Sequence, residues 1–267
     1  MRVFITGAGG FIGRALAARL TARGDVVTGV DLVPGPGVVP GDITRPGVWQ
    51  DGLKGADAVV HTAAIVSNAA GMDAQWRVNT VGTRRVLDAA VRAGVPRFVL
   101  LSSVRAFSDT GFPDGVTEDH PVRPDGNPYV DTKIACEQVA LQAHAAGETA
   151  RRAASGRRGT GVHAQRRHRR DLQGLLRALL PDARQARAAR GADRRRAPGR
   201  PGGPALARVA GVRSELNPVS LRYLTRTGTY SIAKARRTLG YQPAVGLADG
   251  MERTRTWLAE RGLVPAR

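Results

Sequence analysis

The sequence is poor in cysteine and has no long apolar runs. Cys136 is the one cysteine among 267 residues, which excludes a disulfide framework and a cysteine-cluster zinc site. No run of about 18 uncharged apolar residues occurs, and no charged-then-apolar leader precedes the first glycines. We therefore expect a cytoplasmic protein of a reducing compartment, without a membrane segment.

Aromatic residues, lysine and glutamate are all absent from residues 151–213. The same segment holds 18 arginines against three aspartates, so it carries +15 of the formal net charge of +19. The rest of the chain carries +4, which is ordinary for an enzyme. The strongly basic balance therefore describes one segment and not the whole protein.

Three interpretations of this arginine-rich segment remain open. Clustered arginines can neutralise nucleic-acid phosphates, but no aromatic side chain is interleaved for base stacking, so we expect no nucleic-acid partner. The segment can also be a natural disordered insertion. We favour a third hypothesis, that residues 148–213 are a frameshifted or otherwise aberrant translation, because GC-rich DNA read out of frame yields Ala, Arg, Gly and Pro.

Before that segment, short apolar runs alternate with helical patterns, which predicts an α/β fold with a Rossmann-like, doubly wound parallel sheet. Ile12, Leu16 and Leu20 recur every four residues and indicate the apolar face of the first helix. Helices are also expected at 231–239 and 247–261. The expected strands are 3–6, 25–31, 57–61 and 97–101, and the expected helices before the arginine-rich segment are 11–23, 75–93 and 128–146.

A glycine triplet lies between the first expected strand and the first expected helix. Gly7, Gly10 and Gly13 allow a tight turn that brings a pyrophosphate against the helix N-terminus. Asp31 ends the second strand, where a carboxylate can accept hydrogen bonds from both ribose hydroxyls of adenosine. The same carboxylate would repel a 2′-phosphate, which favours NAD over NADP.

Tyr129 and Lys133 stand four residues apart in an expected helix and so share one face. A nearby ammonium stabilises a phenolate, which lets Tyr129 take a proton from a substrate hydroxyl while hydride leaves the carbon. Lys133 can also bind the nicotinamide ribose. Ser103 follows the fourth strand, where ligands collect in such sheets, and can bind the reacting oxygen.

Together these residues resemble the extended short-chain dehydrogenase/reductases of the NAD-dependent epimerase/dehydratase type. The resemblance covers about residues 1–147 and returns at Tyr230–Arg237 and Leu239–Pro243. It implies that Ser103, Tyr129 and Lys133 are catalytic. It also implies that Asp42 and Ile43 bracket the adenine and that Ala63 and Ala64 line the ribose and phosphate side of the cofactor. Asn79 would brace the central helices. The cofactor-binding set it implies is Gly7, Gly10, Phe11, Ile12, Gly13, Asp31, Asp42, Ile43, Ala63, Ala64, Asn79, Ser102, Tyr129 and Lys133.

The resemblance also sets the expected function. It implies an NAD-dependent oxidoreductase or epimerase acting on a secondary alcohol or ketone, most often of a nucleotide-linked sugar or similar small molecule, and a homodimer. The family's strand and Arg-Pro…Tyr-Gly-Pro stretch after the catalytic helix are missing here. We therefore expect an NAD-binding domain at 1–147, an aberrant segment at 148–213 and a small, incomplete C-terminal substrate region at 214–267. NAD binding with weak or absent turnover is expected, and the alternative is a non-catalytic NAD-binding pseudoenzyme or regulatory protein.

Overall fold

The computed structural model describes residues 1–107, 114–146 and 218–265. These residues form two compact units, one holding 1–107 and 121–146 and the other holding 114–120 and 218–265. The arginine-rich segment lies outside the described residues, so its expected aberrant or disordered nature stays a prediction.

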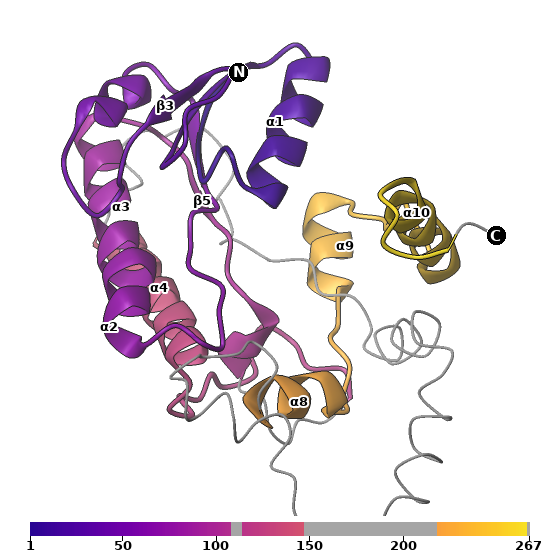
Figure 1. Cartoon of the computed structure of the whole chain (residues 1–267). Helices are drawn as coiled ribbons and strands as arrows, with labels where there is room; N and C mark the ends of the chain where they lie inside the picture. The colour runs from indigo at the N-terminus through magenta and orange to yellow at the C-terminus, as the bar shows by residue number, and fades with distance from the viewer. Residues whose placement is uncertain (108–113, 147–217, 266–267) are drawn as a thin grey trace, which may run out of the picture. The chain divides into compact units, whose positions relative to one another are not determined.

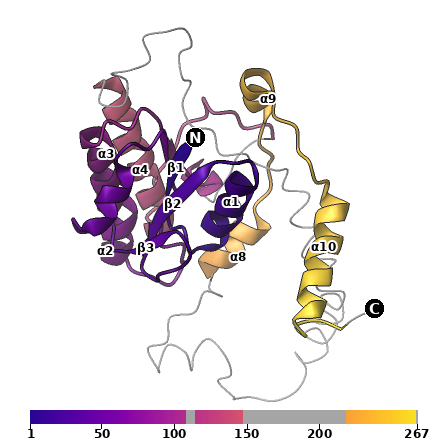
Figure 2. The same cartoon turned by 90° about the horizontal axis from the view of Figure 1, so that it is seen from above.

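The larger unit is built on a five-stranded parallel sheet (Figure 2). Its spatial order is β3-β2-β1-β4-β5. The chain therefore adds β2 and β3 on one side of β1, and then adds β4 and β5 on the other side. This reversal beside β1 is the arrangement that the alternating pattern predicts. The strands are β1 (Arg2–Thr6), β2 (Val26–Asp31), β3 (Val38–Pro40), β4 (Ala58–His61) and β5 (Phe98–Leu100).

Helices cover both faces of the sheet (Figures 1 and 2). Helix α1 (Phe11–Ala22) packs Leu16 and Leu20 onto the side of β1 that carries Val3 and Ile5. Ile12 does not join them, because it is 49% exposed, so the expected apolar face begins one turn later than its spacing predicts. The other face packs Phe4 and Val59 against helix α3 (Thr83–Arg92) and the 3₁₀ helix Val48–Leu53.

The long helix expected at 75–93 is instead three joined pieces. It starts earlier, as α2 (Met72–Gln75), passes through a π-helical turn at Trp76–Gly82, and continues as α3. Helix α4 (Pro128–Ala145) packs against all three pieces. A π turn inserts an extra residue into the helix, and such turns are frequent at functional sites.

Helix α4 begins where its sequence favours a start. The side-chain oxygen of Asn127 accepts hydrogen bonds from the backbone N–H groups of Tyr129 (2.9 Å) and Val130 (3.4 Å). Pro128 follows at the first helical position, where no amide hydrogen is needed. This cap fixes the position of Tyr129 in the first turn of the helix.

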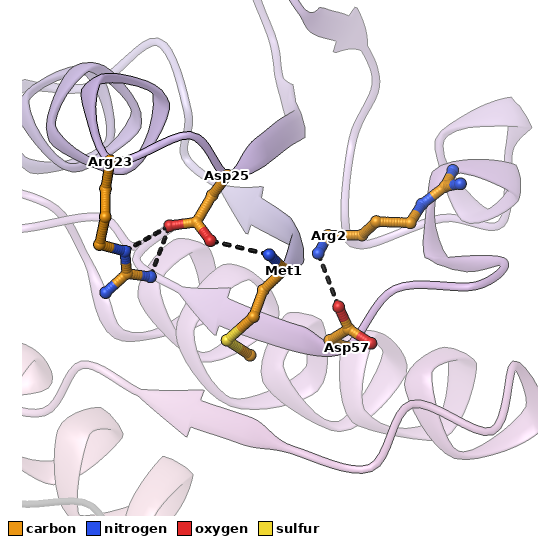
Figure 3. Close-up of polar contacts among 5 residues, drawn as sticks. All are labelled: Met1, Arg2, Arg23, Asp25 and Asp57. Atoms are coloured by element: carbon orange, nitrogen blue, oxygen red, sulfur yellow. Dashed lines mark hydrogen bonds and ion pairs between the residues drawn. The ribbon is translucent and has the colours of Figure 1, made fainter.

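Two aspartates secure the start of β1 between its neighbours, as Figure 3 shows. Asp25 accepts hydrogen bonds from the N-terminal ammonium of Met1 (2.9 Å) and from Arg23 Nε (2.6 Å). The bond from that ammonium is the main reason that the pKa of Asp25 is lowered. Asp57 accepts a bond from the backbone N–H of Arg2 at 2.7 Å. These contacts lie at the amino ends of the strands.

The smaller unit joins residues 114–120 to the C-terminal helices. Val116 forms a parallel bridge to Tyr230, with hydrogen bonds to Thr229 (2.9 Å) and from Ser231 (2.8 Å) on either side. The helices are α8 (Pro218–Thr225), α9 (Ala233–Leu239) and α10 (Leu247–Glu260). No helix in the described residues is both long enough and apolar enough to cross a bilayer.

Candidate functional site

Four strands of the larger unit end at one edge of the sheet. Thr6 of β1 pairs with Val30 of β2 and with His61 of β4, and His61 pairs in turn with Leu100 of β5. The segments that follow these ends are therefore neighbours, although they are far apart in sequence. In open parallel sheets this carboxyl edge is where ligands bind, at the point where strand order reverses.

The turn after β1 needs its glycines for close backbone approach. Gly7 has φ of +70°, a conformation that side chains rarely adopt. A Cβ on Gly13 would overlap the carbonyl oxygen of Gly7 and lie 2.8 Å from Ala8 Cα. Gly10 Nα–H donates to Gly7 O at 3.0 Å and closes the turn. These contacts bring the first turn of α1 directly against the end of β1.

The N-terminus of α1 has the features of an anion site. Gly10 is its N-cap, no side chain caps it in the described part of the chain, and its first turn carries no acidic residue. Its leading N–H groups therefore combine with the positive end of the helix dipole. Phe11 is 87% exposed and Ile12 is half exposed beside this turn. The turn can accept a phosphate without displacing a protein group.

Asp31 is oriented by the backbone at both carboxylate oxygens. Oδ2 accepts a hydrogen bond from Gly9 N–H at 3.0 Å, and Oδ1 accepts one from Leu32 N–H at 2.7 Å. A Cβ on Gly9 would lie 3.2 Å from Asp31 Cγ, so glycine there allows the approach. Because each oxygen has a second lone pair, Asp31 can still accept hydroxyl hydrogens from a ribose.

Two pairs assigned by resemblance lie at the same edge. Asp42 Oδ1 accepts the backbone N–H of Thr44 at 2.8 Å, and this bond lowers the pKa of Asp42. Ile43 is 6% exposed and packs in the core, so its side chain serves packing in this structure. Ala63 and Ala64 are half-buried in the segment after β4. Adenine bracketing and ribose contact by these residues remain predictions.

A chain of buried hydrogen bonds connects the carboxyl ends of β1 and β4 to helix α3. His61 is 2% exposed, with Nδ1 at 2.6 Å from Thr6 Oγ1 and Nε2 at 2.9 Å from Thr83 Oγ1. Thr83 Oγ1 donates its own hydrogen to Asn79 O, so it must accept from His61. Nε2 therefore carries the ring proton, and Nδ1 accepts from Thr6. Ala63 N–H donates to Thr6 Oγ1 at 3.3 Å and completes the chain.

Burial keeps that histidine neutral. Desolvation, with the charge of Lys133 as a smaller cause, lowers the pKa of His61 to about 3. The sequence motifs include Thr6, His61 and Thr83 but assign no role to Thr6 or Thr83, and they favour His61 as a core or cofactor-adjacent residue. Their signal was present, since Thr6 and His61 end the two strands on either side of the reversal.

Asn79 connects three elements from within the π turn. Its Oδ1 accepts Ile65 N–H at 2.8 Å, and its Nδ2 donates to Ile65 O at 3.0 Å and to Thr132 Oγ1 at 3.1 Å. Thr132 lies in α4 directly before Lys133. Asn79 therefore links the segment after β4 to the helix that bears Tyr129 and Lys133.

Helix α4 contacts the segment after β5 through Lys133 and Glu137. Lys133 is 5% exposed, and its Nζ donates to Leu101 O at 2.7 Å. Burial lowers the pKa of Lys133, while Cys136 and the negative charge of Glu137 act in the opposite direction. Ser102 Oγ donates to Glu137 Oε1, so Ser102 is held by the same helix.

Ser103 and Tyr129 are connected through a residue that sequence reasoning missed. Ser103 Oγ accepts the backbone N–H of Arg105 at 3.2 Å. The Arg105 guanidinium carbon lies 5.3 Å from the centroid of the Tyr129 ring. The three expected catalytic residues thus gather around Leu101–Arg105. No cluster of metal-ligating side chains occurs among residues 1–107, 114–146 and 218–265.

Comparison with known proteins identifies the family. The model of the NAD dependent epimerase/dehydratase family matches residues 3–188. The chain belongs to this family. The match runs past residue 147, where the recognised motifs stop, and into the arginine-rich segment.

Several relatives and solved structures are similar to the chain. A farnesyl-dihydroquinoline-oxide ketoreductase of Stigmatella aurantiaca is 35% identical over 56% of this chain and 48% of its own length. A 3 beta-hydroxysteroid dehydrogenase/isomerase of Mycobacterium tuberculosis is 34% identical over 52% of this chain and 42% of its own length. The chain thus spans less than half the length of these curated relatives.

Two NAD-bound crystal structures cover nearly the whole chain. MoeE5, solved with UDP-glucose and NAD, is 26% identical over 97% of this chain and 100% of its own, with a TM-score of 0.61. A short-chain dehydrogenase/reductase superfamily protein of Agrobacterium tumefaciens, solved with NAD, is 24% identical with the same TM-score over 98% of this chain and 99% of its own. The expected Rossmann-like fold is confirmed.

Proposed function

We propose that this chain binds NAD along the carboxyl edge of its sheet. The observation that carries the proposal is that one edge holds both an uncapped helix N-terminus behind a glycine turn and a backbone-oriented carboxylate, Asp31. The first suits a pyrophosphate and the second suits an adenosine ribose. NAD, when bound, supplies the hydride acceptor or donor for chemistry on the substrate.

We assign the proton chemistry to the residues near the end of β5. Ser103 binds the reacting oxygen, and Tyr129 takes the proton of the substrate hydroxyl as that carbon loses a hydride and becomes a carbonyl. Lys133 supplies positive charge to the same site from one turn along α4. In the reverse direction Tyr129 returns the proton. This role is supported by the gathering of all three residues around Leu101–Arg105.

We infer a small secondary alcohol or ketone as the substrate, with a nucleotide-linked sugar as the first class to test. MoeE5 was solved with UDP-glucose, whereas the curated relatives include steroid and quinoline-oxide enzymes. Epimerisation, dehydration and simple oxidoreduction all begin with the same hydride transfer. A homodimer and a cytoplasmic location are part of the same proposal.

We further propose that turnover is weak in this chain. The stretch expected near the nicotinamide and substrate is replaced by residues 148–213, which carry 18 arginines and no aromatic residue. The proposed division into 1–147, 148–213 and 214–267 follows from that replacement. Resequencing the gene across this segment tests the frameshift hypothesis, which fails if no reading frame encodes a strand followed by Arg-Pro…Tyr-Gly-Pro.

Calorimetric titration with NADH tests cofactor binding. We expect saturable binding by the folded protein, and about tenfold weaker binding by Asp31→Asn, since the ribose loses a charge-assisted hydrogen bond. Asp51→Asn is the control, because Asp51 is exposed and pairs only locally with Lys54. Absence of NADH binding by folded wild-type protein would refute the proposed function.

A second comparison separates the enzyme from a non-catalytic NAD-binding protein. Tyr129→Phe should bind NADH as wild type does and lose at least about tenfold of any turnover, because the proton acceptor is removed. If both proteins bind NADH and neither turns over any sugar nucleotide or hydroxysteroid, the pseudoenzyme alternative holds.

A further inference from the structure

Arg105 is a buried cation beside the proposed proton acceptor. It lies in the 3₁₀ helix Val104–Phe107 after β5 and is 5% exposed. Arginine is seldom buried without a specific role for its charge or its hydrogen bonds. The proposed function uses Ser103, Tyr129 and Lys133 and leaves this guanidinium without a task.

The contacts of Arg105 reach three parts of the site. Its guanidinium carbon lies 5.3 Å from the Tyr129 ring centroid, and its Nη1 donates to Asn68 Oδ1 at 2.7 Å. Its backbone N–H donates to Ser103 Oγ at 3.2 Å. The Asn68 contact anchors one nitrogen of the guanidinium, and the backbone contact holds the serine that the proposed reaction uses. Arg105 therefore relates Ser103 and Tyr129 to one another.

Charge adds to this geometry. The Arg105 guanidinium lies over the Tyr129 ring, and Lys133 follows Tyr129 by one turn of α4. Burial disfavours the charged form of Lys133, whereas the nearby Glu137 favours it. The Arg105 guanidinium brings a positive charge to within 5.3 Å of the ring centroid. A cation close to a buried phenol favours the phenolate.

We propose that Arg105 is a positioning residue for Tyr129, which holds the ring by cation–π contact and favours its ionised form. The assignment rests on the proposed role of Tyr129 as proton acceptor. It predicts that proton transfer needs the positive charge at residue 105 as well as the ammonium of Lys133. A planar guanidinium over the ring also restricts the directions from which a substrate hydroxyl can approach.

Spectrophotometric titration of tyrosine ionisation tests the proposal without any substrate. The signal of Tyr129 is isolated by subtracting the titration of Tyr129→Phe, with and without saturating NAD. We expect Arg105→Met to move the Tyr129 midpoint upward by about one pH unit, which leaves about tenfold less phenolate at neutral pH. Arg105→Lys should recover at least half of that shift, because it retains the charge.

Control variants separate charge from packing. Arg123→Met removes an exposed arginine from the loop before α4 and should leave the midpoint unchanged. Asn68→Ala removes one hydrogen-bond partner of the guanidinium and should give a smaller upward shift than Arg105→Met. This variant keeps the test available if the methionine variant fails to fold.

The outcomes are distinct. An unchanged Tyr129 midpoint in folded Arg105→Met overturns the proposal, and so does an equal shift in Arg105→Met and Arg105→Lys, which indicates packing alone. Failure of wild-type protein to bind NAD refutes the proposed function instead, while the titration of the free protein still decides the role of Arg105.

Discussion

Gly13 shows how a single absent side chain shapes the proposed cofactor site. A Cβ at this position would overlap Gly7 O and crowd Ala8, both of which belong to backbone that cannot rotate away. We expect Gly13→Ala to destabilise the fold by about 1–3 kcal/mol and to weaken NADH binding at least about tenfold, because the turn must move away from α1. Chemical denaturation and calorimetry measure the two effects.

Gly250→Ala is the matched control for that prediction. Gly250 lies in α10, where an added Cβ meets only Val245 Cγ1 at 3.8 Å. The alanine variant should be neutral or stabilised by up to about 1 kcal/mol, as expected in a helix interior. A Gly13→Ala protein with unchanged stability and NADH affinity would contradict the close approach described for the turn.

Sequence patterns predicted residues whose position depends on a local turn or strand end, and missed those whose position depends on burial. Gly7, Gly13 and Asp31 follow strands at recognisable spacing, so they could be predicted. Arg105 and Glu137 have no such signal, because a charged residue after a strand or on a helix is normally solvated. Only the packing of α4 against the segment after β5 places them at the site.

The neutral His61 joins strand to helix and makes stability depend on pH. Its pKa is lowered to about 3 in the folded protein, against 6.5 for an unperturbed histidine. Between these values the unfolded chain binds the extra proton, so stability is fully present above about pH 6.5 and is lost as pH falls toward about 3. Between about pH 6.5 and pH 3 we expect this group to lower the free energy of unfolding by about 1.4 kcal/mol for each pH unit of acidification.

Urea denaturation at a series of pH values measures this slope. A His61→Gln variant is less stable at neutral pH, because it breaks the bonds to Thr6 and Thr83, but it should lack the contribution of His61 to the slope. The half-buried His120, which lies in the smaller unit, serves as control through His120→Gln. Identical slopes in wild type and His61→Gln would show that the ring is not held neutral by the fold.

The local sequence pattern predicted the longer strands and helix α4, but it did not predict the short strand β3 or the π turn. Strands β1, β2, β4 and β5 and helix α4 lie within two residues of their predicted bounds, because their apolar runs and the Asn127–Pro128 start are local signals. Strand β3 was missed because it has three residues and depends on pairing with β2. The π turn at 76–82 was missed because it arises from the contacts of Asn79 with Ile65 and Thr132.

Cofactor binding should slow amide hydrogen exchange in the larger unit of the molecule and not in the smaller unit. All proposed cofactor contacts lie within residues 1–107 and 121–146, whereas residues 114–120 and 218–265 contribute none. NAD at about one hundredfold above its dissociation constant stabilises the state that binds it by about 2.7 kcal/mol. We expect hydrogen exchange to slow in the first set, with β1, β4 and α4 most affected.

Mass-spectrometric exchange with and without NAD checks this expectation peptide by peptide. AMP is a useful control, since it should reproduce the protection near Asp31 and not that near Lys133. Equal protection of peptides from 218–265 would show that the C-terminal helices take part in cofactor binding.

The family's substrate-side stretch could not be located from the sequence, because the arginine-rich segment holds neither strand alternation nor a sustained helical stripe.

The strand order has a consequence for synthesis of the polypeptide. Strand β1 is made first but lies at the centre of the sheet, so it gains β2 on one side early and waits for residues 58–61 to gain β4 on the other. The ammonium of Lys133 arrives only when α4 has emerged from the ribosome. A nascent chain therefore exposes an apolar central strand through nearly half of the larger unit's translation, a window in which chaperones can act.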